Sequence, residues 1–214
     1  MGRRRTRPPA DWRTGRRLMR PLLIVISAPS GAGKTTLCDR LLQDYPEITY
    51  SVSCTTREQR GLEENGVDYF FLTHAAFAER VAAGQLMEHA TVHGNRYGTL
   101  RAPVEEAMAE GQSALMDIDV EGASQVRAFV ETLPPGHPMR VGFVDIFIRP
   151  PSLTALRARL EGRGEDSDEA IEIRMENAET EIARADEYTH QIVNDHLDTA
   201  YRELVEVIEA AGRG

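Results

Sequence analysis

The sequence predicts an α/β fold in which a parallel β-sheet core is flanked by helices. A short apolar segment rich in β-branched residues at 22–28 is typical of a strand buried on both faces, and the segments 114–120 and 141–148 are also predicted as strands. Segments with apolar residues at helical spacing lie between them. A glycine-rich turn separates the first expected strand from the first expected helix. With 214 residues, the chain has room for one such domain with small inserts.

The first half of the chain begins with the strand at 22–28, and Leu37, Leu41 and Leu42 then predict a helix over 35–43. A polar stretch that carries arginines runs from 54 to 68. The other elements expected in this half are strands at 48–53 and 69–72, a helix at 75–83 that ends at Gly84, and a strand at 86–92 before a turn at Gly94-Asn95.

In the second half, Pro103 near the start and Gly111 past the end bound a helix over 103–110. Strands follow at 114–120, which carries two acids near its carboxyl end, and at 141–148. The remaining expected elements are a charged helical segment over 153–185 that is broken at 162–164, a strand at 191–194 and a helix at 196–211. In a parallel sheet of this kind, ligands are expected at the carboxyl ends of the strands.

The composition argues against several classes of function. No apolar run approaches the roughly 20 residues that span a bilayer. Cys38 and Cys54 are the only cysteines, too few for a disulfide framework or a zinc site, and they favour a reducing compartment such as the cytoplasm. The net charge is −9, whereas nucleic-acid binding needs clustered positive charge. We therefore expect neither a membrane nor a nucleic acid among the partners.

Residues 1–20 differ from the rest of the chain. They hold eight arginines against one acid, Asp11, so this leader carries +7 and the remainder −16. Such a segment is compatible with a nucleic-acid or membrane arm or with a transit sequence. We favour a disordered basic leader or a misassigned start, because the segment lacks apolar periodicity and Met19 opens a second reading that enters the first strand directly.

A phosphate-binding loop is predicted between the first strand and the first helix. Eight consecutive residues fit the pattern, with alanine in place of its first glycine: Ala28, Pro29, Ser30, Gly31, Ala32, Gly33, Lys34 and Thr35. The glycines let the backbone turn its N–H groups toward phosphate, and the new helix adds its positive end. The lysine supplies charge to the β- and γ-phosphates, and the threonine hydroxyl can ligate Mg²⁺. The motif predicts ATP binding over this loop and Thr36, with Mg²⁺ as cofactor.

Lys34 is also the only lysine among the 25 Lys and Arg residues. Where arginine stands almost everywhere else, a single lysine marks a position at which the two are not interchangeable. A compact ammonium group between phosphates is such a position, so we expect Lys34 to be catalytic.

From Cys54 onward the sequence resembles the nucleotide-binding signature of guanylate kinases. The signature positions are Thr55, Thr56, Arg57, Glu58, Gln59, Arg60, Glu63, Gly66, Tyr69 and Phe71. The phosphate loop and the segments 95–99, 117–119, 162–164 and 193–195 add to the resemblance, which covers residues 21–211. It implies a P-loop NTPase fold with a core (21–53, 101–150 and 177–211), a GMP-binding insert (54–100) and a lid (151–176). The implied reaction is ATP + GMP = ADP + GDP, a step in GMP recycling and in GTP and dGTP supply.

Two arginines and two tyrosines are expected at the acceptor phosphate. A nucleoside monophosphate is largely dianionic at pH 7, and forked guanidinium groups suit it. Arg57 and Arg60 lie three apart in a polar loop, and Tyr69 and Tyr97 can add hydroxyl donors. The resemblance implies that these four residues hold the phosphate of GMP. The alternative is that the arginines are solvated surface residues.

The resemblance also assigns four residues to guanine. Glu88 and Asp119 are the expected carboxylates, and Ser53 and Thr99 the expected hydroxyls. Guanine offers N1–H and N2 amino donors to carboxylates and an O6 acceptor to hydroxyls. Adenine has neither donor and would leave a buried carboxylate unpaired, which predicts discrimination against AMP. The pocket leaves dGMP open as a further substrate, and by sequence alone Glu88 is equally compatible with an exposed strand acid.

Three arginines, Arg159, Arg163 and Arg174, lie in the broken helical segment. The resemblance implies that this segment is a lid over ATP and that its arginines neutralise charge on the transferring phosphoryl group. A salt-bridged helical face is the alternative. The residues expected to be catalytic are accordingly Lys34, Arg57, Arg163 and Arg174.

The resemblance places Asn194 near adenine and Asp117 near Mg²⁺, where Thr35 is the other expected ligand. No general base is expected, because the acceptor phosphate is already an anion and the protein has only to supply position and positive charge.

Three positions depart from common family usage: Gln59 where proline is frequent, Glu121 in place of glutamine, and His196 in place of a second aspartate.

Two other functions compete with a guanylate kinase. One is a non-catalytic module that binds proteins, which the intact loop and lid residues disfavour. The other is a P-loop kinase for a sugar phosphate, which would have no use for the pair of carboxylates. A monomer and a homo-oligomer are both compatible with the sequence.

Overall fold

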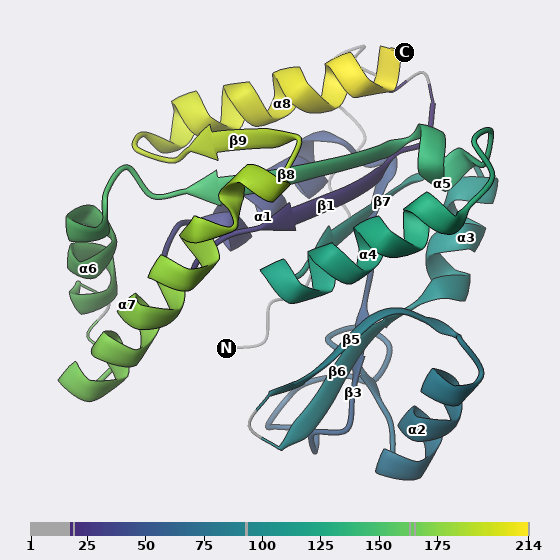
Figure 1. Ribbon diagram of the computed structural model, residues 1–214, viewed down its shortest axis with the longest axis horizontal. Coiled ribbons are helices and arrows are strands. Elements are labelled where there is room, and N and C mark those ends of the chain that lie inside the picture. Colours follow the sequence, from purple (N-terminus) through teal and green to yellow (C-terminus); the bar gives the residue numbers. More distant parts are fainter. Residues whose placement is uncertain (1–17, 19, 93, 163, 165, 214) are drawn as a thin grey trace.

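A computed structural model describes residues 18, 20–92, 94–162, 164 and 166–213 (Figure 1). The core is a five-stranded sheet in the order β2-β7-β1-β8-β9, and its four strand pairings are all parallel. The strands are β1 (Leu23–Ser27), β2 (Ile48–Tyr50), β7 (Ser113–Asp117), β8 (Phe143–Arg149) and β9 (His190–Val193). The α/β class predicted from the sequence is therefore confirmed.

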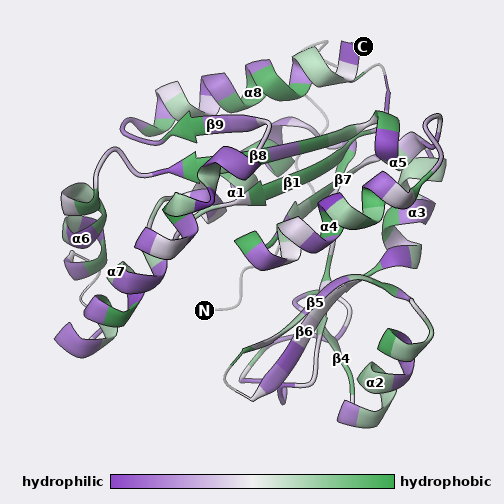
Figure 2. Ribbon diagram, in the orientation of Figure 1, coloured by the Kyte–Doolittle hydropathy of each residue, from purple (hydrophilic) through white to green (hydrophobic). Residues whose placement is uncertain are grey.

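Helices cover both faces of this sheet because the residues of β1 point alternately to the two sides. Ile24 and Ile26 join an apolar cluster with α1 (Lys34–Asp44) and α8 (Leu197–Arg213). Leu23 and Val25 join a second cluster with the helices of the opposite face, which are α3 (Arg101–Ala109), α4 (Val120–Thr132) and α5 (Pro138–Val141). Figure 2 shows the central strands as the most hydrophobic part of the ribbon. A strand buried on both faces needs this continuous apolar run.

A second, smaller sheet lies below the core in Figure 1, with strand order β4-β3-β6-β5. Its strands are β3 (Ser53–Thr55), β4 (Phe70–Phe71), β5 (Leu86–Val92) and β6 (Asn95–Leu100), and α2 (His74–Ala82) packs beside it. Many contacts join β5 to α4 of the core, so this sheet is held against the helix that follows β7.

The third part is a pair of helices, α6 (Leu153–Glu161) and α7 (Asp168–Ala183), with a small apolar cluster of its own. Both helices begin at serine caps: Ser152 and Ser167 accept hydrogen bonds from backbone N–H groups of the first turn, as N-cap residues do. A short 3₁₀ turn, η1 (Ala185–Glu187), returns the chain to β9.

A buried ion pair fixes α4 to the sheet. Asp145 of β8 is fully buried, and its carboxylate accepts from Arg127 of α4 at 2.8 Å and from the backbone N–H of Thr189 at 2.9 Å. Arg127 also donates to Glu187 at 2.8 Å. Removing one partner of such a pair strands a buried charge, which is strongly destabilising. The start of α4, where Asp119 lies, is thereby held in register with the core.

Two predicted strands are wrong in their bounds, and other elements were not predicted. The segment 48–53 is two strands in two different sheets, because the chain leaves the core sheet between Tyr50 and Ser53. The strand predicted to reach Val120 ends at Asp117, and Asp119 caps α4, a helix that the prediction lacked. The strand β6 was missed as well.

The basic leader lies outside the described residues except for Leu18 and Arg20. No helix in the described part of the chain is long and apolar enough to cross a membrane.

Candidate active site

The glycine-rich loop runs from the end of β1 to the first residue of α1. Gly31 and Gly33 adopt φ angles of 91° and 92°, which side chains rarely tolerate. Both also lack the space for one: a Cβ on Gly31 would lie 3.0 Å from Leu160 of α6, and a Cβ on Gly33 would lie 2.3 Å from the amide nitrogen of Asn194. The loop is therefore packed closely between α6 and the end of β9.

Lys34 opens α1 and turns back toward the end of β7. Its ammonium group contacts the carboxylate of Asp117 and donates to the carbonyl of Ile118 at 3.2 Å. Asp117 lies beside Ile26 of β1, at the carboxyl end of the sheet. Thr35 and Thr36 are exposed on the first turn of the helix. The predicted lysine, hydroxyl and carboxylate are thus brought to one edge of the sheet.

The predicted Mg²⁺ ligands are Thr35 and Asp117. Among the described residues no group of three or more His, Cys, Asp or Glu side chains could hold a metal ion. Mg²⁺ bound with a nucleotide does not need such a cage, since it takes one or two protein oxygens and completes its shell with phosphates and water. An exposed Thr35 hydroxyl and the half-buried Asp117 carboxylate fit that requirement.

Arg57 is held by Glu63, a signature residue for which no role was predicted. Both terminal nitrogens of its guanidinium group donate to the Glu63 carboxylate, at 2.7 and 3.0 Å, and the backbone N–H of Arg60 donates to the same carboxylate at 2.8 Å. The guanidinium group holds the pKa of Glu63 below its usual range. The side chain of Arg57 is only 10% exposed and lies 5.3 Å from the ring centre of Tyr69.

Tyr69 and Tyr97 meet edge to face, with ring centres 6.1 Å apart. The hydrogen bond to Glu63 raises the pKa of Arg57, and Tyr97 adds a smaller contribution in the same direction. Three of the four residues predicted for the acceptor phosphate therefore form one cluster. Arg60 is exposed at its edge.

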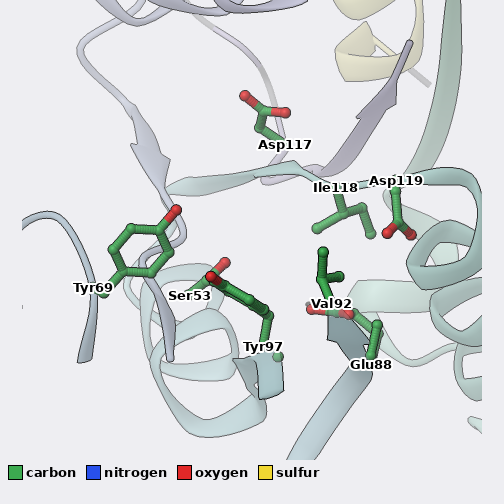
Figure 3. A pocket seen from close by; sticks show the side chains of 10 residues that line it. Ser53, Tyr69, Glu88, Val92, Tyr97, Asp117, Ile118 and Asp119 are labelled. Atoms are coloured by element: carbon green, nitrogen blue, oxygen red, sulfur yellow. The ribbon is translucent and has the colours of Figure 1, made fainter. Parts of the chain in front are cut away.

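A cavity of about 340 Å³ opens between the two sheets (Figure 3). Five of the residues predicted for GMP line it, together with Asp117 at the end of β7 and Ile118 just after it; the five are Ser53, Tyr69, Glu88, Tyr97 and Asp119. In Figure 3, Tyr69 lies on one side of the opening and the two carboxylates, Glu88 and Asp119, lie together on the other. Tyr69 and the carboxylate pair of Glu88 and Asp119 thus lie on opposite sides of the cavity, while Asp117 lies apart from that pair.

Glu88 is the buried carboxylate of this cavity. Its side chain accepts from the Thr99 hydroxyl at 2.7 Å, because the two residues face each other across β5 and β6. The residue is 7% exposed, and burial raises its pKa to about 7, with a further contribution from the charge of Asp119. Thr99 also pairs with Ser53 of β3, so both predicted hydroxyls lie in the same stretch of sheet.

Gly122, in the first turn of α4, makes room for the two carboxylates. A Cβ at this position would lie 3.0 Å from a Glu88 oxygen and 3.4 Å from an oxygen of Asp119. The Asp119 carboxylate accepts from the Gly122 N–H at 2.8 Å as the helix cap. Gly122 was not among the residues predicted for the site, although an aspartate three residues before it is a typical cap signal.

Of the two described arginines predicted for the lid, Arg174 contacts the glycine-rich loop and Arg159 does not. Arg174 of α7 donates to the Ser30 hydroxyl at 2.6 Å and to Asp166 at 3.0 Å. Arg159 of α6 instead donates to the backbone carbonyls of Asn194 and Asp195, at 2.8 and 3.3 Å. Arg163 lies outside the described residues.

Two further features of α7 and β9 were not foreseen. Glu181, half-buried on α7, has its pKa raised by burial, while the charge of Lys34 acts in the opposite direction. Asn194, expected near adenine, is buried, and its amide donates to the Ala32 carbonyl at 2.7 Å.

The three departures from family usage lie around this site without entering it. Gln59 donates its side-chain amide to the carbonyl of Glu63, a bond that proline could not make. Glu121 pairs with Arg184 at 3.0 Å, and His196 is exposed beside Asp195.

Comparisons with known proteins agree with one another. A sequence model of the family described as guanylate kinase matches residues 19–211. The guanylate kinase of Nitrosomonas europaea is 45% identical over 188 residues, which cover 88% of this chain and 89% of that protein. That of Anaeromyxobacter dehalogenans is 47% identical over 188 residues, which cover 87% of this chain and 79% of that protein.

The crystal structure of guanylate kinase from Anaplasma phagocytophilum shares the fold, with a TM-score of 0.67 at 30% identity over 92% of this chain and 88% of that chain. The family match spans both sheets and the lid helices, and the similarity to these relatives extends over most of their length as well. The chain therefore belongs to the guanylate kinase family.

Proposed function

We propose that the chain transfers the γ-phosphoryl group of Mg·ATP to GMP, yielding ADP and GDP. The observation that carries this proposal is the pair of carboxylates, Glu88 and Asp119, on one side of a cavity whose other side holds Tyr69 and Tyr97. Carboxylates accept from the N1–H and N2 amino groups of guanine, and tyrosine hydroxyls donate to phosphate. The two sides of the cavity thus match the two ends of GMP.

The acceptor phosphate is assigned to Arg57, Arg60, Tyr69 and Tyr97. Glu63 occupies the end of the Arg57 guanidinium group, and the Nε side of that group is the edge that remains for a phosphate. An arginine that is already oriented loses less side-chain entropy when the phosphate binds.

The guanine base is assigned to Glu88, Asp119, Ser53 and Thr99. The Thr99 hydroxyl orients the Glu88 carboxylate, which is the group that a base without N–H donors would leave buried and unpaired. The cavity gives no reason to exclude dGMP, because the groups assigned here touch base and phosphate.

The donor phosphates are assigned to the loop from Ala28 to Thr36, with Lys34 as the mobile charge. Lys34 would leave Asp117 for the β- and γ-oxygens when ATP binds. Thr35 and Asp117 would hold the Mg²⁺ ion, which neutralises phosphate charge. The loop from Gly31 to Lys34 supplies backbone N–H groups at the positive end of α1.

We assign to the lid, residues 151–176, the role of closing over ATP. Arg174 already reaches Ser30 of the loop, so a small movement brings its charge to the phosphates, and Arg163 is assigned the same role from its sequence position. Arg159 and Asn194 complete the ATP side. Closure would exclude water, which keeps the phosphoryl group from being lost to hydrolysis. The acceptor is an anion, so no residue has to remove a proton.

Two other functions are less compatible with the site. A protein-binding module would need neither the oriented Arg57 nor the contact of Lys34 with Asp117. A kinase for sugar phosphates would gain nothing from a Glu88 carboxylate whose pKa is raised to about 7 by burial. We also propose the cytoplasm as the location, since the chain has only two cysteines, Cys38 and Cys54, and both are buried, which suits a reducing compartment.

The proposal is tested by a coupled assay of ADP release with GMP, AMP and a sugar phosphate as acceptors. GMP should be turned over, and AMP should have a kcat/KM lower by about a hundredfold or more, because adenine leaves Glu88 unpaired. Comparable kcat/KM values for AMP and GMP, or a preference for the sugar phosphate, would overturn the assignment.

A further inference from the structure

Asn194 occupies an unusual place for a residue expected to contact a base. It follows β9 directly, and its backbone N–H continues the sheet by donating to the Arg149 carbonyl at 2.8 Å. The residue is 5% exposed. Its side chain thus lies under the glycine-rich loop, with little surface left for a nucleotide base.

The side-chain amide is bonded to the loop itself. Nδ2 donates to the carbonyl of Ala32 at 2.7 Å, and both groups are buried. The next residue, Gly33, has no side chain to interfere, and a Cβ there would lie 2.3 Å from the same nitrogen. The amide therefore fills the space that this glycine leaves, which gives Gly33 a second reason to be glycine besides its φ of 92°.

This bond fixes the direction of one peptide group in the loop. In a trans peptide the carbonyl and the following N–H point in opposite directions. With the Ala32 carbonyl turned toward Asn194, the Gly33 N–H is directed away from it, and Lys34 follows as the first residue of α1. Inward-turned N–H groups are what a phosphate-binding loop uses to hold its ligand.

We propose that Asn194 is a positioning residue for the phosphate loop: it acts through the Ala32 carbonyl on triphosphate binding and does not recognise the adenine base. This inference rests on the proposed function, and it specifies how the loop that binds the phosphates of ATP is held in place. It concerns a contact between residues 162 positions apart in the chain, so it is a property of the fold.

The test compares Mg·ATP with Mg·tripolyphosphate, which has the phosphates and lacks the base. Competition binding is measured for the unsubstituted protein and for Asn194→Ala, which removes the donor without adding charge. The loss of one neutral hydrogen bond predicts that both ligands weaken by a similar factor of about tenfold. GMP affinity, measured on the same samples, should not change and verifies that the variant is folded.

A loss of affinity for ATP with unchanged affinity for tripolyphosphate would overturn the proposal in favour of base contact. Unchanged affinity for both would show that the bond does not position the loop. A failure of tripolyphosphate to compete with ATP in the unsubstituted protein would contradict the loop geometry on which the proposal depends.

If Asn194→Ala does not fold, Asn194→Ser, which keeps a shorter donor, carries the same comparison. A second readout is the ratio of kcat/KM for ATP and ITP as phosphoryl donors. That ratio should be the same in the variant as in the unsubstituted protein, because the base is not what Asn194 reads. These binding readouts do not depend on turnover of GMP, so failure of the proposed reaction would be distinguishable from failure of this inference.

Discussion

Replacing Glu88 by glutamine changes two properties in opposite directions. Glutamine has nearly the shape of glutamate and keeps a carbonyl oxygen for the Thr99 hydroxyl, which now bonds to Glu88 at 2.7 Å. It removes a charge from a site that is 7% exposed. The free protein should therefore become more stable while it binds GMP more weakly.

The gain in stability follows from the pKa. Burial raises the pKa of Glu88 from 4.5 to about 7, so the folded protein prefers the protonated acid. The stability that this preference contributes is complete below pH 4.5 and is lost as the pH rises through 7. At about 1.4 kcal/mol per pKa unit, the ionised carboxylate costs the folded state about 3 kcal/mol at pH 8. Glu88→Gln should recover most of that at pH 8 and little of it at pH 5.

The loss of affinity follows from the donors of guanine. A carboxylate accepts from both N1–H and N2, whereas an amide accepts at one atom and presents its own donor at the other. Because only the ionised acid accepts twice, GMP should bind the unsubstituted protein about tenfold more tightly at pH 8 than at pH 6. Titration of the GMP phosphate itself adds about twofold over that range. Glu88→Gln should retain only that smaller dependence.

Denaturant unfolding and GMP titration at pH 5, 6 and 8 measure both effects. Glu64→Gln, an exposed carboxylate of the same insert, is the matched control and should change neither quantity. A variant that is less stable than the unsubstituted protein at pH 8, or one that binds GMP with unchanged affinity, would refute the place given to Glu88.

Other substitutions follow from the same geometry. Lys34→Arg should lower kcat by about a thousandfold or more without lowering the melting temperature, because a planar guanidinium group does not replace a compact ammonium between phosphates; near-normal turnover would remove Lys34 from the reaction. Glu63→Gln should raise the KM for GMP by about tenfold through loss of the charged partner that orients Arg57, with the KM for ATP unchanged; an equal rise for ATP would show a general loss of structure instead. Gly122→Ala should also raise the KM for GMP, because its Cβ would lie 3.0 Å from a carboxylate oxygen, whereas Gly136→Ala, with nothing within 4 Å, should behave as the unsubstituted protein.

The core of the fold could be predicted because its signals are local. The segment 23–26 is apolar throughout and is predicted as a buried strand without knowledge of its neighbours. Helix α4 carries an equally local signal, since Val120, Ala123, Val126 and Val130 stand at helical spacing after the cap Asp119. It was missed because the apolar run of the preceding strand was continued through the acids to Val120.

The second sheet is different, because its strands depend on one another. The segment 95–100 contains Gly98, has no alternating pattern, and is a strand because β3 and β5 pair with it on both sides. Nothing in residues 51–52 marks the passage from one sheet to the other. Here tertiary pairing overrides the local preference.

The sequence predicts which ligand each site residue serves, but it does not predict the hydrogen bonds that these residues make with one another. Resemblance to a signature indicates which residue types serve which ligand, and the structure brings most of the assigned GMP residues to one cavity. It does not say that Glu63 holds Arg57, because the loop between them has no regular spacing that would indicate which side chains meet. It does not say that Asn194 holds Ala32 either, because a hydrogen-bond partner 162 positions away leaves no trace in sequence spacing.

The fate of the γ-phosphate tests the proposed reaction most directly. The protein is incubated with Mg·ATP labelled at the γ-phosphate and with unlabelled GMP, and the labelled products are separated by chromatography. The proposed reaction predicts that the label appears in GDP in step with ADP formation, and that AMP in place of GMP receives almost none. Label found only in inorganic phosphate, or label transferred equally well to AMP, would contradict a GMP kinase built on the carboxylates of Glu88 and Asp119.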